Sequence, residues 1–174
     1  HFAERGRNVI CFEPDPIVGE RLQTWASPRN NVRIDHRALG SSDDVLQWYR
    51  TPESSGANSL LPFLESHQPV GTVEVRNING ALSEYLGESD RVAVLKVDCE
   101  GSDLLLMESL DWARWNPACV VVEFDGQKVD AKSRSLEAHV LAKELEKAGY
   151  TCVFSAWHPV VKYGSPHDFL GIFN

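Results

Sequence analysis

Short apolar runs alternate with amphipathic stretches along most of this chain. Between the first two runs, Val18, Leu22 and Trp25 recur at the spacing of one helix face. The runs themselves are typical of strands and lie at residues 8–13, 32–36, 92–98 and 118–124. The last run is apolar nearly throughout, as expected for a strand covered on both faces. Strands that alternate with helices are typical of a mostly parallel sheet, so the pattern predicts an α/β fold.

Capping residues mark the ends of two predicted helices. Asp15 followed by Pro16 predicts a helix start, because aspartate is a favoured N-cap and proline fits the first helical position. Gly149 predicts a helix end, because glycine accepts the left-handed conformation there. The predicted helices are the one after Asp15, a short one near 81–86, one from Ser102, and a longer one through 136–148.

Residues 41–80 interrupt this alternation. They predict extra strands at 45–49 and 73–76 around a polar loop at 51–59, which is too long to be a mere connection. At the other end of the chain, residues 150–154 and 169–173 predict two closing strands, antiparallel because no helical pattern lies between them. The chain shows no internal repeat or linker, so we predict a single domain over 1–174.

Composition narrows the classes of protein and partner. The chain has 174 residues, of which 43% are apolar and 24% charged, as in globular proteins. A net charge of −8 argues against a nucleic-acid partner, and no apolar run approaches the roughly 20 residues of a membrane span. Four cysteines without a C-x-x-C pair predict buried small hydrophobes and a reducing, cytoplasmic compartment: Cys11, Cys99, Cys119 and Cys152.

Two of the predicted strands end in acidic residues, Phe-Glu-Pro at 12–14 and Lys-Val-Asp-Cys-Glu-Gly at 96–101. Ligands of open α/β sheets lie beyond the carboxyl ends of the strands. The two segments resemble the FkbM-type family of S-adenosylmethionine-dependent methyltransferases, whose members carry F-E-P and K-(I/V)-D-x-E-G strand ends. Residues 2–6, 37–40 and 120–123 resemble the end of the family's first helix, its third strand end and its fifth strand.

The resemblance implies a Rossmann-like class I methyltransferase sheet, mostly parallel with an antiparallel C-terminal strand. One family motif, a strand followed by D-x-G-A-x-x-G that holds the methionine part of the cofactor, belongs before His1 and is not in this chain. In that fold the missing first strand is the middle of the sheet, between 8–13 and 92–98. We therefore expect an N-terminally incomplete domain with two inner strand edges that lack a partner.

The resemblance also implies S-adenosylmethionine as the cofactor. Glu13 is the predicted ribose ligand, because one carboxylate can accept both hydroxyls of a diol. Asp35 is expected near the adenine amine, and the same strand ends assign Pro14, Ala38 and Asp98 to the cofactor site. The alternative for Glu13 is a surface glutamate that caps a turn.

Asp98, Glu100 and Lys96 are the predicted catalytic residues. Methyl transfer from a sulfonium needs an acceptor oxygen that is held close and relieved of its proton, and a strand-end carboxylate suits both tasks. The structural alternative is a Lys96–Asp98 ion pair, with Glu100 near a helix start where negative charge is favoured. Glu123 and Asp125 end the next strand and can join Asp98 as oxygen ligands for Mg²⁺, although the resemblance makes a metal possible rather than expected.

These residues predict an S-adenosylmethionine-dependent methyltransferase that acts on a hydroxyl of a small molecule, such as a sugar or a polyketide-like metabolite. The alternative is a non-catalytic interaction module of the same fold, which the missing glycine-rich motif favours. Either way, we expect a small-molecule ligand and neither a nucleic-acid nor a membrane partner.

Overall fold

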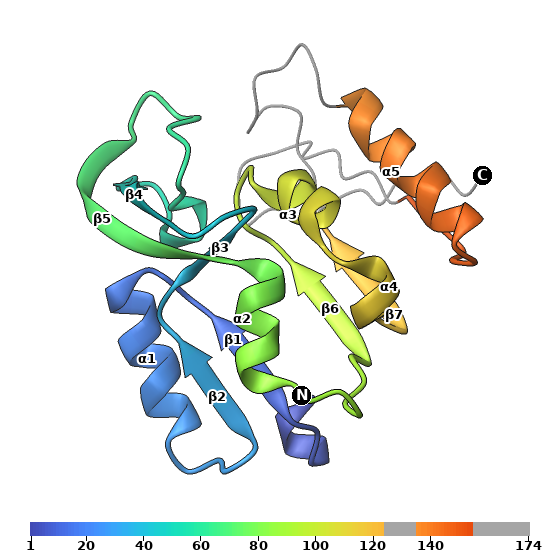
Figure 1. The fold of residues 1–174 in the computed structure, drawn as a ribbon. Helices are drawn as coiled ribbons and strands as arrows, with labels where there is room; N and C mark the ends of the chain where they lie inside the picture. The colour runs from blue at the N-terminus through green and yellow to red at the C-terminus, as the bar shows by residue number, and fades with distance from the viewer. Residues whose placement is uncertain (124–134, 155–174) are drawn as a thin grey trace, which may run out of the picture. The chain divides into compact units, whose positions relative to one another are not determined.

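The computed structural model describes residues 1–123 and 135–154 (Figure 1). The chain divides into two compact units, His1–Ser135 and Leu136–Asn174, which we describe separately. The prediction of one domain over 1–174 stays a prediction. Among the described residues, every helix is too short or too polar to cross a membrane.

The first unit contains strands and helices in alternation, with an insertion of extra strands (Figure 1). Two 3-10 turns, Ala3–Arg5 and Ser55–Ala57, accompany them. The regular elements are β1 (Val9–Phe12), α1 (Pro16–Ala26), β2 (Val32–Asp35), β3 (Ala38–Gly40), β4 (Asp44–Arg50), β5 (Gln68–Asn77), α2 (Ile78–Tyr85), β6 (Val94–Val97), α3 (Asp103–Ser109), α4 (Trp112–Trp115) and β7 (Cys119–Val122).

The strands of this unit form three small sheets. β1 pairs with β2, β3 with β5 and β6 with β7, all in parallel, while β4 pairs with β5 in the antiparallel sense. The predicted mixed α/β fold with mostly parallel pairing is confirmed. Within the described residues, β1 has β2 as its strand partner and β6 has β7, so each keeps one edge without a strand partner there. A further strand between β1 and β6 stays a prediction.

The hydrophobic core lies where α2 and α3 contact each other and β3, with β5 beside α2. Ile78 and Ala81 of α2 and Leu106 and Met107 of α3 are all 0% exposed. α2 begins at Ile78, before the predicted 81–86, because the Asn77 side chain accepts backbone N–H bonds in the first turn of the helix. β5 ends at Asn77 itself, so no loop in the sequence marks this cap.

The family resemblance places residues 37–40 at the end of the family's third strand. In the structure, Ala38–Gly40 form a short separate strand, β3, which pairs in parallel with β5 in the sheet of the insertion. β5 runs from Gln68 to Asn77, longer than the predicted 73–76, because it pairs with β4 along one edge and β3 along the other. The inserted strands β4 and β5 therefore form a sheet of their own together with β3.

β7 is not covered on both faces in the described part of the chain. Cys119 and Val121 are exposed, Val121 by 49%, whereas Val120 and Val122 are half-buried. The prediction of burial on both faces, and of a buried Cys119, is wrong because successive side chains alternate between faces and only one face is covered there. An apolar run alone does not distinguish these two cases.

The other three cysteines were predicted to be buried, and each of them is half-buried. Cys11 lies in β1, Cys99 follows β6, and Cys152 lies outside any strand. All four cysteines are free thiols. Burial raises the pKa of the Cys99 thiol, so that thiol is a poor nucleophile.

The described part of the second unit is the helix α5 (Ser135–Lys147) and the residues that follow it. Its predicted end is confirmed: Gly149 has φ +94°, and the Tyr150 N–H donates to the Leu145 carbonyl over 3.0 Å. Residues 151–154 carry no strand, so the closing strand predicted at 150–154 is wrong. The second closing strand, predicted at 169–173, lies outside the described residues.

The Asp15 carboxylate joins α1 to the inserted β4. Asp15 is 2% exposed and caps α1 as predicted, with the Ile17 and Val18 N–H groups as donors. It also accepts hydrogen bonds from Arg50 Nε at 2.8 Å, Trp48 Nε1 at 3.2 Å and the Asn58 side-chain amide at 2.9 Å. Burial by itself would raise the pKa of Asp15, but the hydrogen bonds from Arg50, Trp48 and the helix lower it to about 2.

Asp15→Asn should lower the free energy of unfolding at pH 7 by about 2 kcal/mol, because the folded-state pKa of Asp15 lies about two units below its unfolded value. A carboxyl group whose pKa is lowered by folding stabilises the folded protein at pH values above its unfolded-state pKa, near 4. This stabilisation is lost as the pH falls through the folded-state pKa of about 2. The difference between the two proteins, measured by urea unfolding, should therefore shrink between about pH 4 and pH 2. Exposed Asp44→Asn is the control, and a pH-independent difference would contradict the prediction.

Candidate active site

The parallel register of β6 and β7 brings two acidic residues together. Val97 pairs with Val122, so the residues that follow them, Asp98 and Glu123, lie side by side at the carboxyl end of the sheet. The Glu123 N–H donates to the Val97 carbonyl over 3.1 Å, which extends the pairing by one residue. The expected convergence of Asp98 and Glu123 is therefore found, while Asp125 lies outside the described residues.

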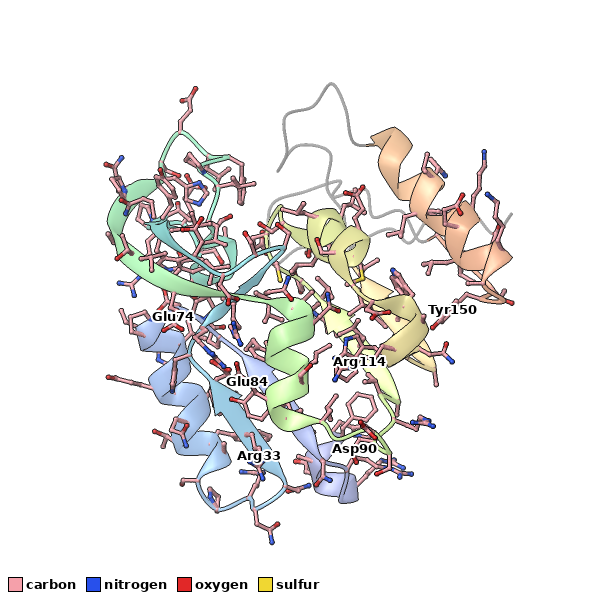
Figure 2. The ribbon with its side chains drawn as sticks, viewed as in Figure 1. Arg33, Glu74, Glu84, Asp90, Arg114 and Tyr150 are labelled. Carbon is pink, nitrogen blue, oxygen red and sulfur yellow. The ribbon has the colours of Figure 1, made fainter. Side chains whose placement is uncertain are left out.

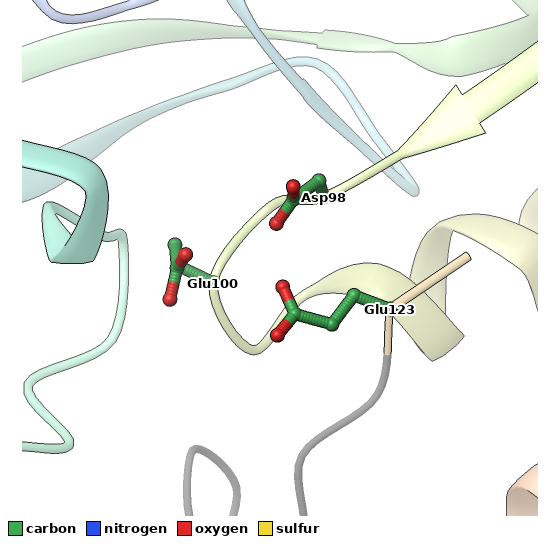
Figure 3. A group of neighbouring side chains, drawn as sticks. All are labelled: Asp98, Glu100 and Glu123. Carbon is green, nitrogen blue, oxygen red and sulfur yellow. The ribbon is translucent and has the colours of Figure 1, made fainter. Parts of the chain in front are cut away.

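Glu100 joins these two residues from the turn that follows β6 (Figure 3). One carboxylate oxygen each of Asp98, Glu100 and Glu123 lies within 4.8 Å of the others. Within residues 1–123 and 135–154, this is the one group of three or more acidic, histidine or cysteine side chains with such spacing. We call it the acid cluster. It can accept a proton or attract a cation, and whether a metal binds there stays open to experiment.

The turn itself depends on the buried carboxylate of Asp103. Asp103 is 5% exposed and accepts the Cys99 N–H over 2.6 Å and the Gly101 N–H over 3.0 Å. Glu100 and Gly101 both have positive φ, +51° and +106°, and the first of these is disfavoured for a residue with a side chain. Asp103 thus holds a strained turn in place. The sequence signal for this turn is an acidic residue two positions after Gly101, and the prediction did not include it.

Lys96 and Asp98 form the ion pair of the structural alternative, and their catalytic role stays a prediction. Lys96 Nζ lies 2.6 Å from Asp98 Oδ2, with side chains 63% and 40% exposed. A pair this exposed contributes only about 0–1 kcal/mol to stability. Asp98 is therefore accessible to a ligand, and its replacement does not leave a buried charge without a partner.

Glu13 occupies the matching position at the end of β1. The register that pairs Phe12 with Asp35 places Glu13 next to His36. One carboxylate oxygen of the half-buried Glu13 accepts the Asp15 N–H over 2.9 Å, and the other receives no hydrogen bond from any described residue. Burial raises the pKa of Glu13 above its ordinary value. The turn-capping alternative and the ligand interpretation thus use different oxygens of the same side chain.

Pro14 lines a shallow pocket of about 350 Å³ beside Glu13. The pocket is open to solvent and lies between the start of α1, the end of β2 and β5. Its other lining residues are Pro16, Glu20, His36, Thr72, Val73 and Glu74.

Asp35, in contrast, has all its hydrogen-bonding capacity engaged within the protein. It is 6% exposed, its carboxylate binds Arg37 through two guanidinium nitrogens, and Tyr85 Oη donates to it over 3.0 Å. Burial alone would raise the pKa of Asp35, but these hydrogen bonds lower it. Arg37 also pairs with Glu84 of α2 at 2.6 Å. Figure 2 labels Glu84 on this helix. An adenine amine would have to displace Arg37 or Tyr85, and this role of Asp35 stays a prediction.

Ala38 is a core residue. It is 5% exposed and pairs with Val75 of β5. Its methyl group is therefore unavailable to a ligand, and its assigned contact with the cofactor, which stays a prediction, would have to involve its backbone.

Two comparisons with known proteins place the sequence of this chain. The sequence profile of the Methyltransferase FkbM domain matches residues 1–152. A curated relative named Methyltransferase 1, from Beauveria bassiana (strain ARSEF 2860), is 28% identical over 141 residues, which are 70% of this chain and 57% of the relative. The chain thus spans little more than half the length of that relative. No solved structure matches the chain significantly.

Asp103→Asn should destabilise the protein by about 1–3 kcal/mol, because one of the two buried N–H groups of the turn then faces an amide NH₂ or loses its acceptor. Chemical denaturation measures the change. Asp90→Asn is the matched control, since Asp90 also accepts a backbone N–H, from Gly87 at 2.8 Å, but at an exposed site. Equal effects of the two substitutions would show that Asp103 does not hold the turn.

Proposed function

The chain belongs to the FkbM methyltransferase family, and on that premise we propose that it binds S-adenosylmethionine and methylates a hydroxyl of a small molecule. A sugar or a polyketide-like metabolite is the proposed class of acceptor, in the cytoplasm and without a nucleic-acid or membrane partner. The observation that carries the proposal is the pair of strand ends, Glu13 after β1 and the acid cluster after β6 and β7. A Rossmann-like class I sheet is part of this proposal.

The residues at the end of β1 suit the ribose of the cofactor. Glu13 has one carboxylate oxygen held by the Asp15 N–H and a second that receives no hydrogen bond from the described residues. A diol can donate both hydroxyl protons to such a carboxylate, and its donation offsets the burial of the charge. Pro14 offers an apolar surface next to it. When bound, S-adenosylmethionine supplies a methyl group on a positively charged sulfur, which keeps the bonding electrons as the methyl leaves.

Asp98 is the residue proposed to act on the acceptor. It is exposed at the strand end, and Lys96 holds one of its oxygens at 2.6 Å. A hydroxyl that donates to Asp98 is oriented by that bond, and its proton passes to the carboxylate as the oxygen forms its bond to the methyl carbon. Glu100 and Glu123 lie within reach of the same acceptor and can hold its further hydroxyls.

Titration calorimetry of the protein with S-adenosylmethionine decides between the enzyme and the alternative, a non-catalytic module of the same fold. We expect saturable binding. Absence of heat at millimolar ligand, with the protein shown to be folded by circular dichroism, would refute the cofactor and favour the module.

Glu13→Ala should weaken S-adenosylmethionine binding by about 1–3 kcal/mol, or roughly 5- to 150-fold, because a charge-assisted pair of hydrogen bonds is lost. Since burial raises the pKa of Glu13, wild-type affinity should also fall as the pH drops toward that pKa and the carboxylate takes up a proton, and the variant should lose this dependence. Calorimetry across pH measures both effects. Exposed Glu88→Ala is the control, and an unchanged affinity of Glu13→Ala would rule out the ribose role.

Asp98→Asn should keep the fold while it lowers turnover by about 10²–10⁴-fold, the usual weight of a positioned acid or base. Transfer of labelled methyl groups from S-adenosylmethionine to a panel of sugars and polyketide-like alcohols measures it, with exposed Asp111→Asn as the control. Loss of folding in Asp98→Asn would instead support a structural role. EDTA should have no effect, and inhibition reversed by Mg²⁺ would mean that the acid cluster binds a metal.

A further inference from the structure

Ser59, in the polar loop between β4 and β5, is a buried polar residue with a defined set of partners. It is 0% exposed, and its backbone exchanges two hydrogen bonds with Tyr49 of β4, at 2.9 and 3.0 Å. Its hydroxyl accepts the Leu61 N–H over 3.0 Å. The hydroxyl proton is therefore left to donate elsewhere, from an oxygen whose position β4 determines.

That proton goes to the turn of the acid cluster. Ser59 Oγ donates to the backbone carbonyl of Glu100 over 2.7 Å. The N–H of the same peptide unit, on Gly101, donates to Asp103. The peptide between Glu100 and Gly101 is thus held at both ends, by Ser59 from the inserted loop and by Asp103 from α3.

This peptide needs such support because of its conformation. Glu100 has φ +51°, which a residue with a side chain rarely adopts, and Gly101 has φ +106°. This peptide sets ψ of Glu100 and φ of Gly101. A residue with a side chain tolerates positive φ only within a narrow range of ψ, so a peptide that is free to rotate lets Glu100 relax to negative φ, which redirects its side chain. Asp103 alone holds only the N–H end, so the bond to the carbonyl is what opposes rotation from the other side.

The neighbouring residue connects the same loop to the other strand end. Asn58 donates its side-chain amide to Asp15 over 2.9 Å, two residues after Glu13. Consecutive residues of one inserted loop therefore contact the segment after β1 and the turn after β6. Their separation along the chain limits how far the two turns can move apart.

We infer that Ser59 is a positioning residue, which directs the Glu100 carboxylate into the acid cluster by holding the Glu100–Gly101 peptide. The inference rests on the proposed function only for what Glu100 does to an acceptor. The geometry of the turn is a property of the protein without ligand and can be measured without it.

The test is nuclear magnetic resonance on the isotope-labelled protein, with Ser59→Ala compared to wild type. A residue at positive φ gives a strong intraresidue HN–Hα Overhauser effect, and that of Glu100 should weaken in the variant. The N–H groups of Cys99 and Gly101 donate to Asp103, and their hydrogen exchange with solvent should accelerate by about tenfold or more in the variant. Ser54→Ala is the matched control, because Ser54 lies in the same loop and its hydroxyl accepts the Gly56 N–H instead.

A merely structural role would lower the melting temperature of Ser59→Ala and leave the Glu100 Overhauser effect unchanged, and this outcome would overturn the inference. Ser59→Cys keeps a side chain of similar size with only a weak donor, so it should show the same changes even where Ser59→Ala does not fold. Calorimetry with S-adenosylmethionine on the same samples keeps the two proposals apart. Loss of binding in the wild type refutes the cofactor, whereas an unaltered turn in both variants refutes the role of Ser59.

Discussion

The carboxylate of Asp15 is the interaction on which the arrangement of this site depends. It caps α1, pairs with Arg50 of β4 and accepts the Asn58 amide, and it lies two residues after Glu13. A helix start, an inserted strand and an inserted loop thus meet at one buried negative charge. Because each donor removed would leave that charge less compensated, the three segments are held together strongly.

The inserted strands and loop therefore support both strand ends of the site, a role that is not evident from their sequence. β4 carries Arg50 to Asp15 and anchors Ser59 through Tyr49, and Ser59 in turn supports the turn of Glu100. Support for both strand ends comes from one segment of the chain. A change in the insertion would consequently reach the proposed cofactor end and the proposed acceptor end together.

Three acidic strand-end residues show how burial and partners distinguish structural from available carboxylates. Asp35 is buried and satisfied by Arg37 and Tyr85, so its charge stabilises the fold. Glu13 is half-buried with one oxygen engaged, and Asp98 is exposed beside a lysine. Only the last two combine a carboxylate with access, and for this reason they carry the proposed function while Asp35 serves better as a support.

Sequence alone determined the features that depend on near neighbours in the chain. The start of α1 at Asp15, the end of α5 at Gly149 and the strand ends that carry Glu13 and Asp98 all follow from residues a few positions apart. Caps and side-chain periodicity act over one or two turns, so a local pattern suffices to predict them. The short segments at the strand ends likewise predicted membership of the methyltransferase family, which the family profile confirms.

Only the tertiary structure decided which side chains meet. Ser59 contacts Glu100 from 41 positions away, and the pairing of Asp35 with Tyr85 spans 50. Nothing in a polar loop or a strand-end aspartate identifies such a partner, because the path of the chain between them sets the contact. The open face of β7 has the same origin: its apolar residues favour burial, but packing determines which of its two faces is covered.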